Sequence, residues 1–289
     1  MKPATIMEIT RLQRMHHGSR RMRGLGAAAG TALMALAAAY SLFPVAWLAV
    51  AATKDGAQLY NTPMFAFPRH FHFLGNLRAA LRFNHGIFAV WCLNSAIYSS
   101  VTAALSCLFS ALCGYSLAKF RFRLRGMFFS LVLVSLLLPS AALALPTFLI
   151  VKNMGLINTY PGVILPMIAS PFGAYFMKVY ADGAIPDALL DSARVEGAGE
   201  WRIFWRIALP IIRPGVAALF LIAFVSSWNN FLLPLLILSS ARLFPLTLGL
   251  RIFPETIMGS FLSILPTIAL FAFLGRSISA GALSDGLKI

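Results

Sequence analysis

Charged side chains are scarce in this chain, and acidic ones are the scarcest. Of its 289 residues, 11% are charged and only nine are Asp or Glu, whereas 59% are hydrophobic. A soluble domain does not need this much apolar content, so the composition excludes an ordinary globular protein. The mean hydropathy of +0.80 points the same way. We therefore predict an all-α protein that crosses a membrane several times.

The chain also lacks the residue groups that catalysis or metal binding needs. All three cysteines fall within one apolar run, without metal-ligand spacing or a disulfide framework; they are Cys92, Cys107 and Cys113. No GxxxxGK[ST] phosphate loop is present, so the chain supplies no ATP site of its own. No Ser/His/Asp or zinc constellation lies in the apolar runs. These absences argue against an enzyme and against a cofactor bound by this chain.

Six apolar runs are predicted to be transmembrane helices, each of which takes about 20 residues. They lie at about 25–50, 87–117, 127–151, 162–180, 210–238 and 259–274. The net charge of +15 arises because Lys and Arg flank these runs. Their unequal distribution predicts that both termini are cytoplasmic. Residues 1–24 then form a basic cytoplasmic tail, and residues 25–289 form one transmembrane domain.

The segment 182–214 holds five of the nine acidic residues and several arginines. Seven charges between Asp187 and Arg206 oppose membrane insertion by about 20 kcal/mol, so the segment is predicted to stay outside the hydrocarbon. Pro186 suits the first position of a short helix, and Gly197 suits its end. A second short helix is expected to end at Pro210 and to have an apolar edge, as a helix does that lies on a membrane surface or packs under a bundle; that edge comprises Trp201, Phe204, Trp205 and Ala208.

This segment resembles the EAA loop of bacterial ABC importer permeases. The resemblance rests on Asp191-Ser192-Ala193, Gly197-Ala198, Trp201-Arg202-Ile203-Phe204 and Ile207-Ala208-Leu209-Pro210. The family usually has Glu and Ala where this chain has Asp191 and Ser192, and Asp where it has Glu196. The GLINTY, ILP and PFG segments between 155 and 173 are similar to the carbohydrate branch, of which the maltose-type permeases are members.

The resemblance implies a type I importer permease fold, with six transmembrane helices and a cytoplasmic coupling helix. The loop would dock on an ATP-binding subunit through the family's motif positions, here Asp191, Ser192, Ala193, Glu196, Gly197 and Ala198. It implies two such subunits, which bind the ATP, a second permease that is commonly a different chain, and an extracytoplasmic solute-binding protein. The location would be the bacterial cytoplasmic membrane, and the solute a sugar or related polyhydroxyl compound.

Four polar or aromatic residues within the apolar runs are candidates for a substrate pathway. Asn94 begins a polar stripe with Tyr98, Thr102 and Ser106, which faces either a neighbouring helix or a pathway. Asn229 and Asn230 offer donors and acceptors that suit a polyhydroxyl solute, and Trp228 suits stacking on a sugar face. The alternative is that these amides bond to neighbouring helices.

Two further alternatives remain open on the sequence. An ion-coupled secondary transporter would need an intramembrane ion site and usually an internal repeat, and neither is clear here. His70, His72 and His85 raise the possibility of a metal site, although histidines beside an aromatic belt explain them better. The sequence names neither the solute nor the identity of the second permease.

Overall fold

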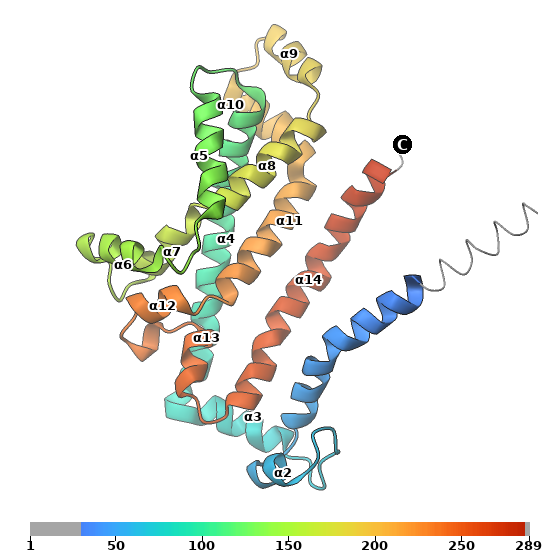
Figure 1. Cartoon of the computed structure of the whole chain (residues 1–289), viewed down its shortest axis with the longest axis vertical. Coiled ribbons are helices and arrows are strands. Elements are labelled where there is room, and N and C mark those ends of the chain that lie inside the picture. The colour runs from blue at the N-terminus through green and yellow to red at the C-terminus, as the bar shows by residue number, and fades with distance from the viewer. Residues whose placement is uncertain (1–29, 287–289) are drawn as a thin grey trace, which may run out of the picture. The chain divides into compact units, whose positions relative to one another are not determined.

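The computed structural model describes residues 30–286, with side chains to residue 273 (Figure 1). Every regular element in this range is helical. The chain divides into two compact units, unit 1 ending at Phe73 and unit 2 beginning at Leu74. The basic tail 1–24 and the first residues of the predicted first span lie outside the described residues.

Unit 1 contains one long apolar helix followed by a folded segment. The helix Gly30–Ala51 has 22 residues, enough to cross a bilayer, and is exposed on almost all sides. Asp55 then caps α2 (Gly56–Asn61) by accepting a hydrogen bond from the Gln58 N–H at 2.7 Å. The residues from Thr62 to His72 follow as a loop.

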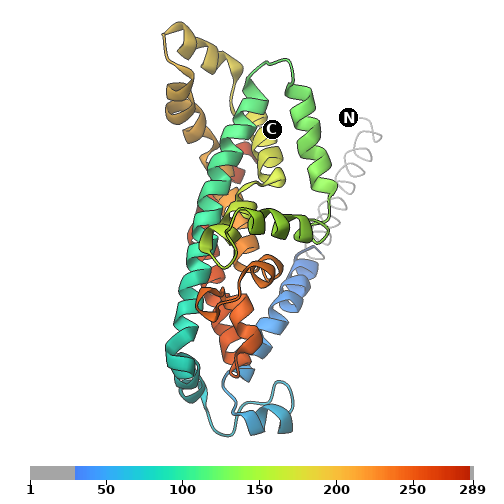
Figure 2. The ribbon, with the colours of Figure 1, turned by 90° about the vertical axis from the view of Figure 1, so that its left-hand side faces the viewer.

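Unit 2 is built around α4 (Ile87–Lys119), which packs against α8 (Pro171–Ala184) and α11 (Leu209–Trp228). Figure 2 shows α4 running the length of this unit. Small residues in the predicted second span allow α4 to pack closely against α8. A Cβ added at Gly114 would lie 2.6 Å from the Met177 Cβ, so only glycine lets the two helices approach this closely.

The start of unit 2 is a short helix with a tight turn. α3 (Phe73–Arg82) leads into the turn η1 (Phe83–Gly86), where Asn84, His85 and Gly86 all have positive φ. The turn redirects the chain into α4. Phe83 and Phe88 flank it and contact Phe253 across the unit, with ring centroids 5.3 and 5.1 Å apart.

The predicted third span, 127–151, is not one helix. α5 (Arg125–Leu137) ends before Pro139, and α6 (Ala144–Asn153) begins five residues after that proline. Pro139 cannot donate a backbone hydrogen bond and disfavours helix in the residue before it, so the chain breaks instead of kinking. The predicted fourth span is interrupted, as expected, because α7 (Tyr160–Ile168) meets α8 at a bend of 41°.

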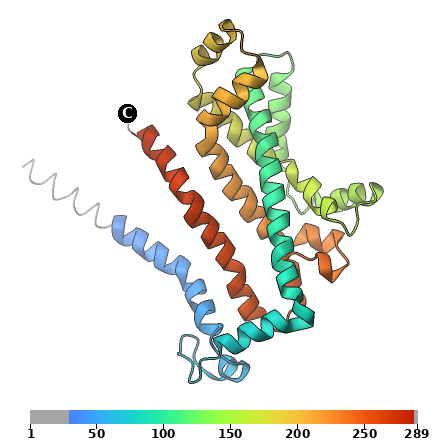
Figure 3. The ribbon, with the colours of Figure 1, turned by 180° about the vertical axis from the view of Figure 1, so that it is seen from behind.

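The remaining helices are α9 (Asp187–Val195), α10 (Glu200–Ile203), the π-helical turn η2 (Phe204–Ala208), α12 (Leu232–Ile237), η3 (Ala241–Leu243), α13 (Leu246–Gly249), η4 (Leu250–Ile252) and α14 (Thr256–Gly286). Of these, α9 and α10 lie towards the C-terminal end of α4, η3 and α13 contact its first half, and α14 packs on α11 (Figure 3). In the part of the chain that the structure describes, four helices are long and apolar enough to cross a membrane. The bent α7–α8 pair makes a fifth. The sixth, at 127–151, stays a prediction.

Candidate functional site

Helix α9 is a short amphipathic helix that packs one edge and exposes the rest. Pro186 is its N-cap and not its first helical residue, so the helix begins one residue later than predicted. Asp187 opens the first turn, where the helix dipole favours a negative charge. Leu190 and Ala193 are buried in a cluster formed by α4, α8 and α11. Val195 is 89% exposed, and Leu189 and Ser192 are exposed as well. α9 therefore packs one edge on the core and leaves the rest of its surface exposed.

The end of α9 is fixed by a glycine in the left-handed conformation. Gly197 has φ +81° and donates from its N–H to the Arg194 carbonyl at 3.0 Å. The next N–H, of Ala198, donates to the Ala193 carbonyl at 3.0 Å. These two bonds form a Schellman motif with Gly197 at C′, as the sequence predicts.

An arginine ties α9 to the helix that follows. The Arg194 guanidinium donates to Glu200 Oε1 at 2.8 Å and to Asp191 Oδ1 at 2.9 Å. The hydrogen bond to Glu200, and then that to Asp191, raise the pKa of Arg194 above its ordinary value, so it is permanently charged. The arginine spans the Gly197 turn and therefore holds α9 and α10 in a fixed relation.

A lysine at the end of α4 anchors the start of α9. The Lys119 side chain is only 5% exposed, and its Nζ lies 2.7 Å from Asp187 Oδ1, which is on the exposed side of the pair. The hydrogen bond from Lys119 and its charge lower the pKa of the Asp187 carboxyl. Ion pairs therefore link both ends of α9 to neighbouring helices, Lys119–Asp187 at its start and Arg194–Glu200 at its end.

After the turn, the chain continues as one helix into the core, which corrects the predicted stop at Pro210. Residues Glu200–Trp228 are helical without a break. The π turn η2 ends two residues before Pro210, and the Leu209 N–H there bonds to the Phe204 carbonyl, five residues back instead of four. This wider turn lets the helix accommodate the proline. The segment thus joins α9 mechanically to α11.

The apolar edge predicted for this helix divides between the core and the surface. Phe204 and Ala208 are buried, but Trp201 is 68% exposed and Trp205 is largely exposed. Ile203, which was not predicted, is fully buried in their place. Trp201 and Ile203 lie before the π turn, so the buried stripe already runs along Ile203, Phe204 and Ala208, and the exposed tryptophans fit a helix edge at the membrane surface.

The six predicted docking residues therefore divide into two groups. Asp191, Ser192, Glu196 and Gly197 are exposed. Ala193 is buried, and Ala198 is half-buried against the same cluster. The first group is available to a partner, whereas the two alanines position the turn.

A polar cavity lies at the far end of α11. Its volume is about 320 Å³, and its lining combines Asn230 with residues of α6, α7, α12 and the 138–143 break: Ser140, Leu143, Ala144, Thr147, Pro166, Ala169, Leu232 and Leu233. The Asn230 amide has only weak partners, the Met167 sulfur at 3.4 Å and the Leu233 N–H at 3.3 Å. An amide can form four hydrogen bonds, so Asn230 has capacity left for a ligand.

The other three predicted pathway residues lie elsewhere. Trp228 is buried and donates from its indole N–H to the Ser263 carbonyl at 3.1 Å. Asn229 is exposed. Asn94 is 1% exposed, donates to the Arg242 and Phe244 carbonyls at 2.8 and 3.0 Å, and accepts from the Tyr160 hydroxyl at 2.7 Å. Of the four, only Asn230 lines the polar cavity.

Asn94 belongs to a row of α4 side chains that hold the loop 241–246. Trp91 donates to the Ala241 carbonyl at 2.7 Å, Tyr98 donates to the Leu243 carbonyl at 3.0 Å, and Ser95 accepts from the Leu246 N–H at 2.7 Å. Asn94 and Tyr98 of the polar stripe therefore face a neighbouring segment, whereas the Thr102 hydroxyl is buried without a hydrogen-bond partner among the described residues. Trp91 and Ser95 were missed because they lie beside the four-residue stripe, not on it.

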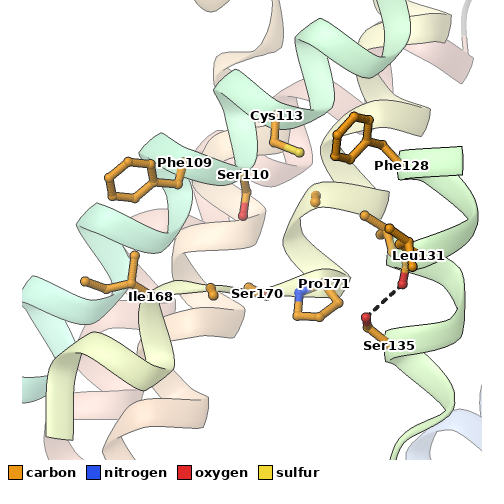
Figure 4. A pocket seen from close by; sticks show the side chains of 12 residues that line it. Phe109, Ser110, Cys113, Phe128, Leu131, Ser135, Ile168, Ser170 and Pro171 are labelled. Carbon is orange, nitrogen blue, oxygen red and sulfur yellow. Dashed lines mark hydrogen bonds between the residues drawn. The ribbon is translucent and has the colours of Figure 1, made fainter. Parts of the chain in front are cut away.

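A second cavity, also of about 320 Å³, lies beside the break between α7 and α8 (Figure 4). Phe109, Ser110 and Cys113 reach it from α4, and Phe128 and Leu131 reach it from α5. Its lining is almost entirely apolar, and the Ser135 hydroxyl on its rim donates to the Leu131 carbonyl at 2.7 Å. This cavity offers little to a polar solute.

No group of three His, Cys, Asp or Glu side chains is placed to hold a metal ion within the range that the structure describes. His70 and His72 lie in unit 1, and His85 lies in unit 2.

Comparison with known proteins identifies what this chain is similar to. Residues 108–280 match the family described as binding-protein-dependent transport system inner membrane component. The arabinooligosaccharides transport system permease protein AraQ of Halalkalibacterium halodurans is 39% identical over 211 residues, covering 70% of this chain and 75% of that protein. The lactose transport system permease protein LacG of Rhizobium radiobacter is 34% identical over 267 residues, covering 88% and 93%.

Two more relatives extend the comparison. The sn-glycerol-3-phosphate transport system permease protein UgpE of Yersinia pestis is 35% identical over 214 residues, covering 73% of this chain and 75% of that protein. A solved chain of a bacterial ABC transporter that imports the acidic polysaccharide alginate has a TM-score of 0.76 at 22% identity, covering 89% of this chain and 97% of that chain. The likeness to the solved chain shows the fold.

Proposed function

Because this chain belongs to the family of binding-protein-dependent transport system inner membrane components, we propose that it carries a sugar or related polyhydroxyl solute across the bacterial cytoplasmic membrane. It is a multi-pass permease subunit of an ABC importer and not an enzyme. The family works with ATP-binding subunits, a solute-binding protein and a second permease. ATP is then bound by partner subunits, and this chain needs no cofactor.

In the complex that we propose, two ATP-binding subunits join this chain and a second permease that is a different chain. Both termini of the present chain lie in the cytoplasm, on the same side as α9. Support for this orientation comes from the excess of Lys and Arg in the segments on that side of the apolar runs.

The single observation that carries the coupling role is the construction of α9. It exposes Leu189, Ser192 and Val195 while an ion pair fixes each of its ends. A surface that must transmit force has to be both accessible and rigid. A partner that closes around α9 on ATP binding would move it as a lever, and the unbroken helix Glu200–Trp228 would carry the motion towards Asn230.

The polar cavity at Asn230 suits a neutral polyhydroxyl solute. Serine, threonine and asparagine side chains supply donors and acceptors among apolar walls, and its lining contains no Lys or Arg. A phosphorylated solute would call for a cationic side chain at this point. The lining therefore favours an uncharged sugar, as in the names of AraQ and LacG, over a phosphate ester, as in that of UgpE.

The coupling role is tested with Leu189→Asp on α9. Leu189 is exposed, so the substitution leaves the core intact, but it puts a charge into the proposed docking face. The matched control is Gly126→Asp, at an exposed site in the first turn of α5 with open space around a new side chain.

Each variant is co-expressed with the ATPase subunits encoded beside it, and both co-purification and ATP-driven sugar uptake are measured. We expect Leu189→Asp to lose the ATPase and at least tenfold in uptake, while Gly126→Asp retains both. Retention of the ATPase and of uptake by Leu189→Asp would overturn the docking role of α9. Uptake that follows an ion gradient and not ATP would overturn the importer assignment.

A further inference from the structure

The loop after the first long helix contains a short stretch without polar side chains. Residues Pro63-Met64-Phe65-Ala66-Phe67-Pro68 are all apolar, whereas the residues on both sides are polar or charged. Met64 and Phe65 are exposed, and Phe67 is 86% exposed. Exposure of two phenylalanines and a methionine within one turn to water is unfavourable, so this hexapeptide is expected to contact an apolar environment.

The hexapeptide folds back along the helix Gly30–Ala51 of the same unit. The Phe65 ring packs on the Phe43 ring with centroids 4.8 Å apart. Phe43 lies eight residues before the end of the helix, which corresponds to about 12 Å along its axis. The loop therefore lies beside the membrane-crossing part of the helix and not beyond its end.

Several backbone groups of the hexapeptide already have partners within unit 1. Pro63 and Pro68 have no N–H to satisfy, and the Ala66 N–H donates to the Pro63 carbonyl at 3.0 Å. The Lys54 ammonium donates to the Pro63 carbonyl at 2.9 Å, to the Met64 carbonyl at 3.4 Å and to the Thr62 hydroxyl at 2.9 Å. Unpaired backbone carbonyls are unfavourable in hydrocarbon, so a lysine that donates to two of them lowers the free-energy cost of insertion into lipid.

Polar residues close the base of the loop. Gln58 accepts from the Arg69 N–H at 2.8 Å and donates to the His70 carbonyl at 3.3 Å. The same amide donates to Asp55 at 2.7 Å. Arg69 and His70 are exposed directly after the apolar hexapeptide, at the level where lipid headgroups would meet them.

We propose that residues 63–68 form a wedge that inserts into the lipid at the membrane surface, beside the helix Gly30–Ala51. The occupant of its exposed apolar face is the boundary between headgroups and acyl chains. Continuity with a membrane-crossing helix, the Phe43–Phe65 contact and the capped carbonyls all favour lipid. Lys54 is 4% exposed and stabilises the wedge from inside.

The wedge is tested by spin labelling of Phe67→Cys in a chain whose three native cysteines are replaced by alanine. The full chain, with its co-purified partner subunits, is reconstituted in phosphatidylcholine–phosphatidylglycerol vesicles. Accessibility of the label to oxygen, which partitions into lipid, is compared with accessibility to a water-soluble nickel chelate. Leu36→Cys, exposed on the apolar helix, is the lipid control, and Ile252→Cys, exposed on η4, is the water control.

The wedge predicts an oxygen-to-nickel accessibility ratio for position 67 on the lipid side of the midpoint between the two controls. A ratio matching Ile252→Cys would place the loop in water and overturn the proposal. Exclusion of both reagents would show a protein partner on this face and would also overturn it.

A second variant tests the role of Lys54. Lys54→Met in the labelled chain keeps the length of the side chain but removes its donors, so position 67 should shift towards the water control. Lys54→Arg, which keeps donors, should hold position 67 nearer to the lipid control than Lys54→Met does. An unchanged ratio in Lys54→Met would overturn the capping role.

Discussion

At the scale of single residues, the α9 turn depends on one backbone conformation. Gly197 has φ +81°, and a Cβ added there would meet nothing within 4 Å. The constraint on this position is therefore conformational and not a matter of space. Gly199, two residues later, has equally open space but φ −70°, which any residue adopts.

Gly197→Val is expected to destabilise the turn by about 1–2 kcal/mol, because a β-branched residue is strained at positive φ. Gly199→Val adds the same side chain without this strain and serves as the control. Thermal unfolding of the purified permease and retention of the ATPase subunit measure the effect. Equal behaviour of the two variants would show that the left-handed turn does not matter.

Residue-level signals in the sequence predicted some of this site and missed the rest. The Gly197 cap could be predicted because a glycine after an amphipathic stretch is a local signal. The Arg194–Glu200 and Lys119–Asp187 pairs could not, since they depend on how a turn and two helices meet in space. The same holds for the distinction between Asn229 and Asn230, because one residue of rotation decides which amide lines the cavity.

At the scale of helices, the sequence located most apolar segments but not where they break. The helix Glu200–Trp228 passes through Pro210 because a π turn precedes the proline, whereas α5 ends before Pro139 because no such turn is available. Both segments contain proline in an apolar context, so composition alone does not separate them. Local hydrogen bonding decides whether the helix continues.

The close contact between α4 and α8 gives a prediction at this scale. Gly114→Val puts a side chain into the Met177 backbone, and we expect a loss of about 1–3 kcal/mol of stability from overpacking. Gly126→Val, at a helical glycine with nothing within 4 Å, controls for the helix propensity of valine. Thermal unfolding in detergent compares the two. A Gly114→Val variant as stable as Gly126→Val would mean that the helices can move apart at no cost.

At the scale of the whole molecule, the orientation in the membrane decides whether α9 can serve as a coupling surface. α9 and α13 lie towards opposite ends of α4 in unit 2 (Figure 1). Val195 on α9 and Ile252 on η4, directly after α13, are both exposed. ATP is confined to the cytoplasm, so the coupling role requires Val195 on the cytoplasmic side and Ile252 on the other.

Cysteine labelling tests this orientation in a chain without its native cysteines, expressed without ATP-binding subunits so that nothing docked on α9 covers Val195. A membrane-impermeant maleimide applied to intact cells should label Ile252→Cys and leave Val195→Cys unlabelled until the membrane is broken. The reverse pattern would place α9 outside the cell, beyond the reach of any ATP-binding subunit, and would rule out the coupling role. Labelling of both sites in intact cells would show that α4 does not carry its two ends to opposite sides of the bilayer. The Lys and Arg asymmetry predicts the first pattern, because these residues are retained on the cytoplasmic side during insertion.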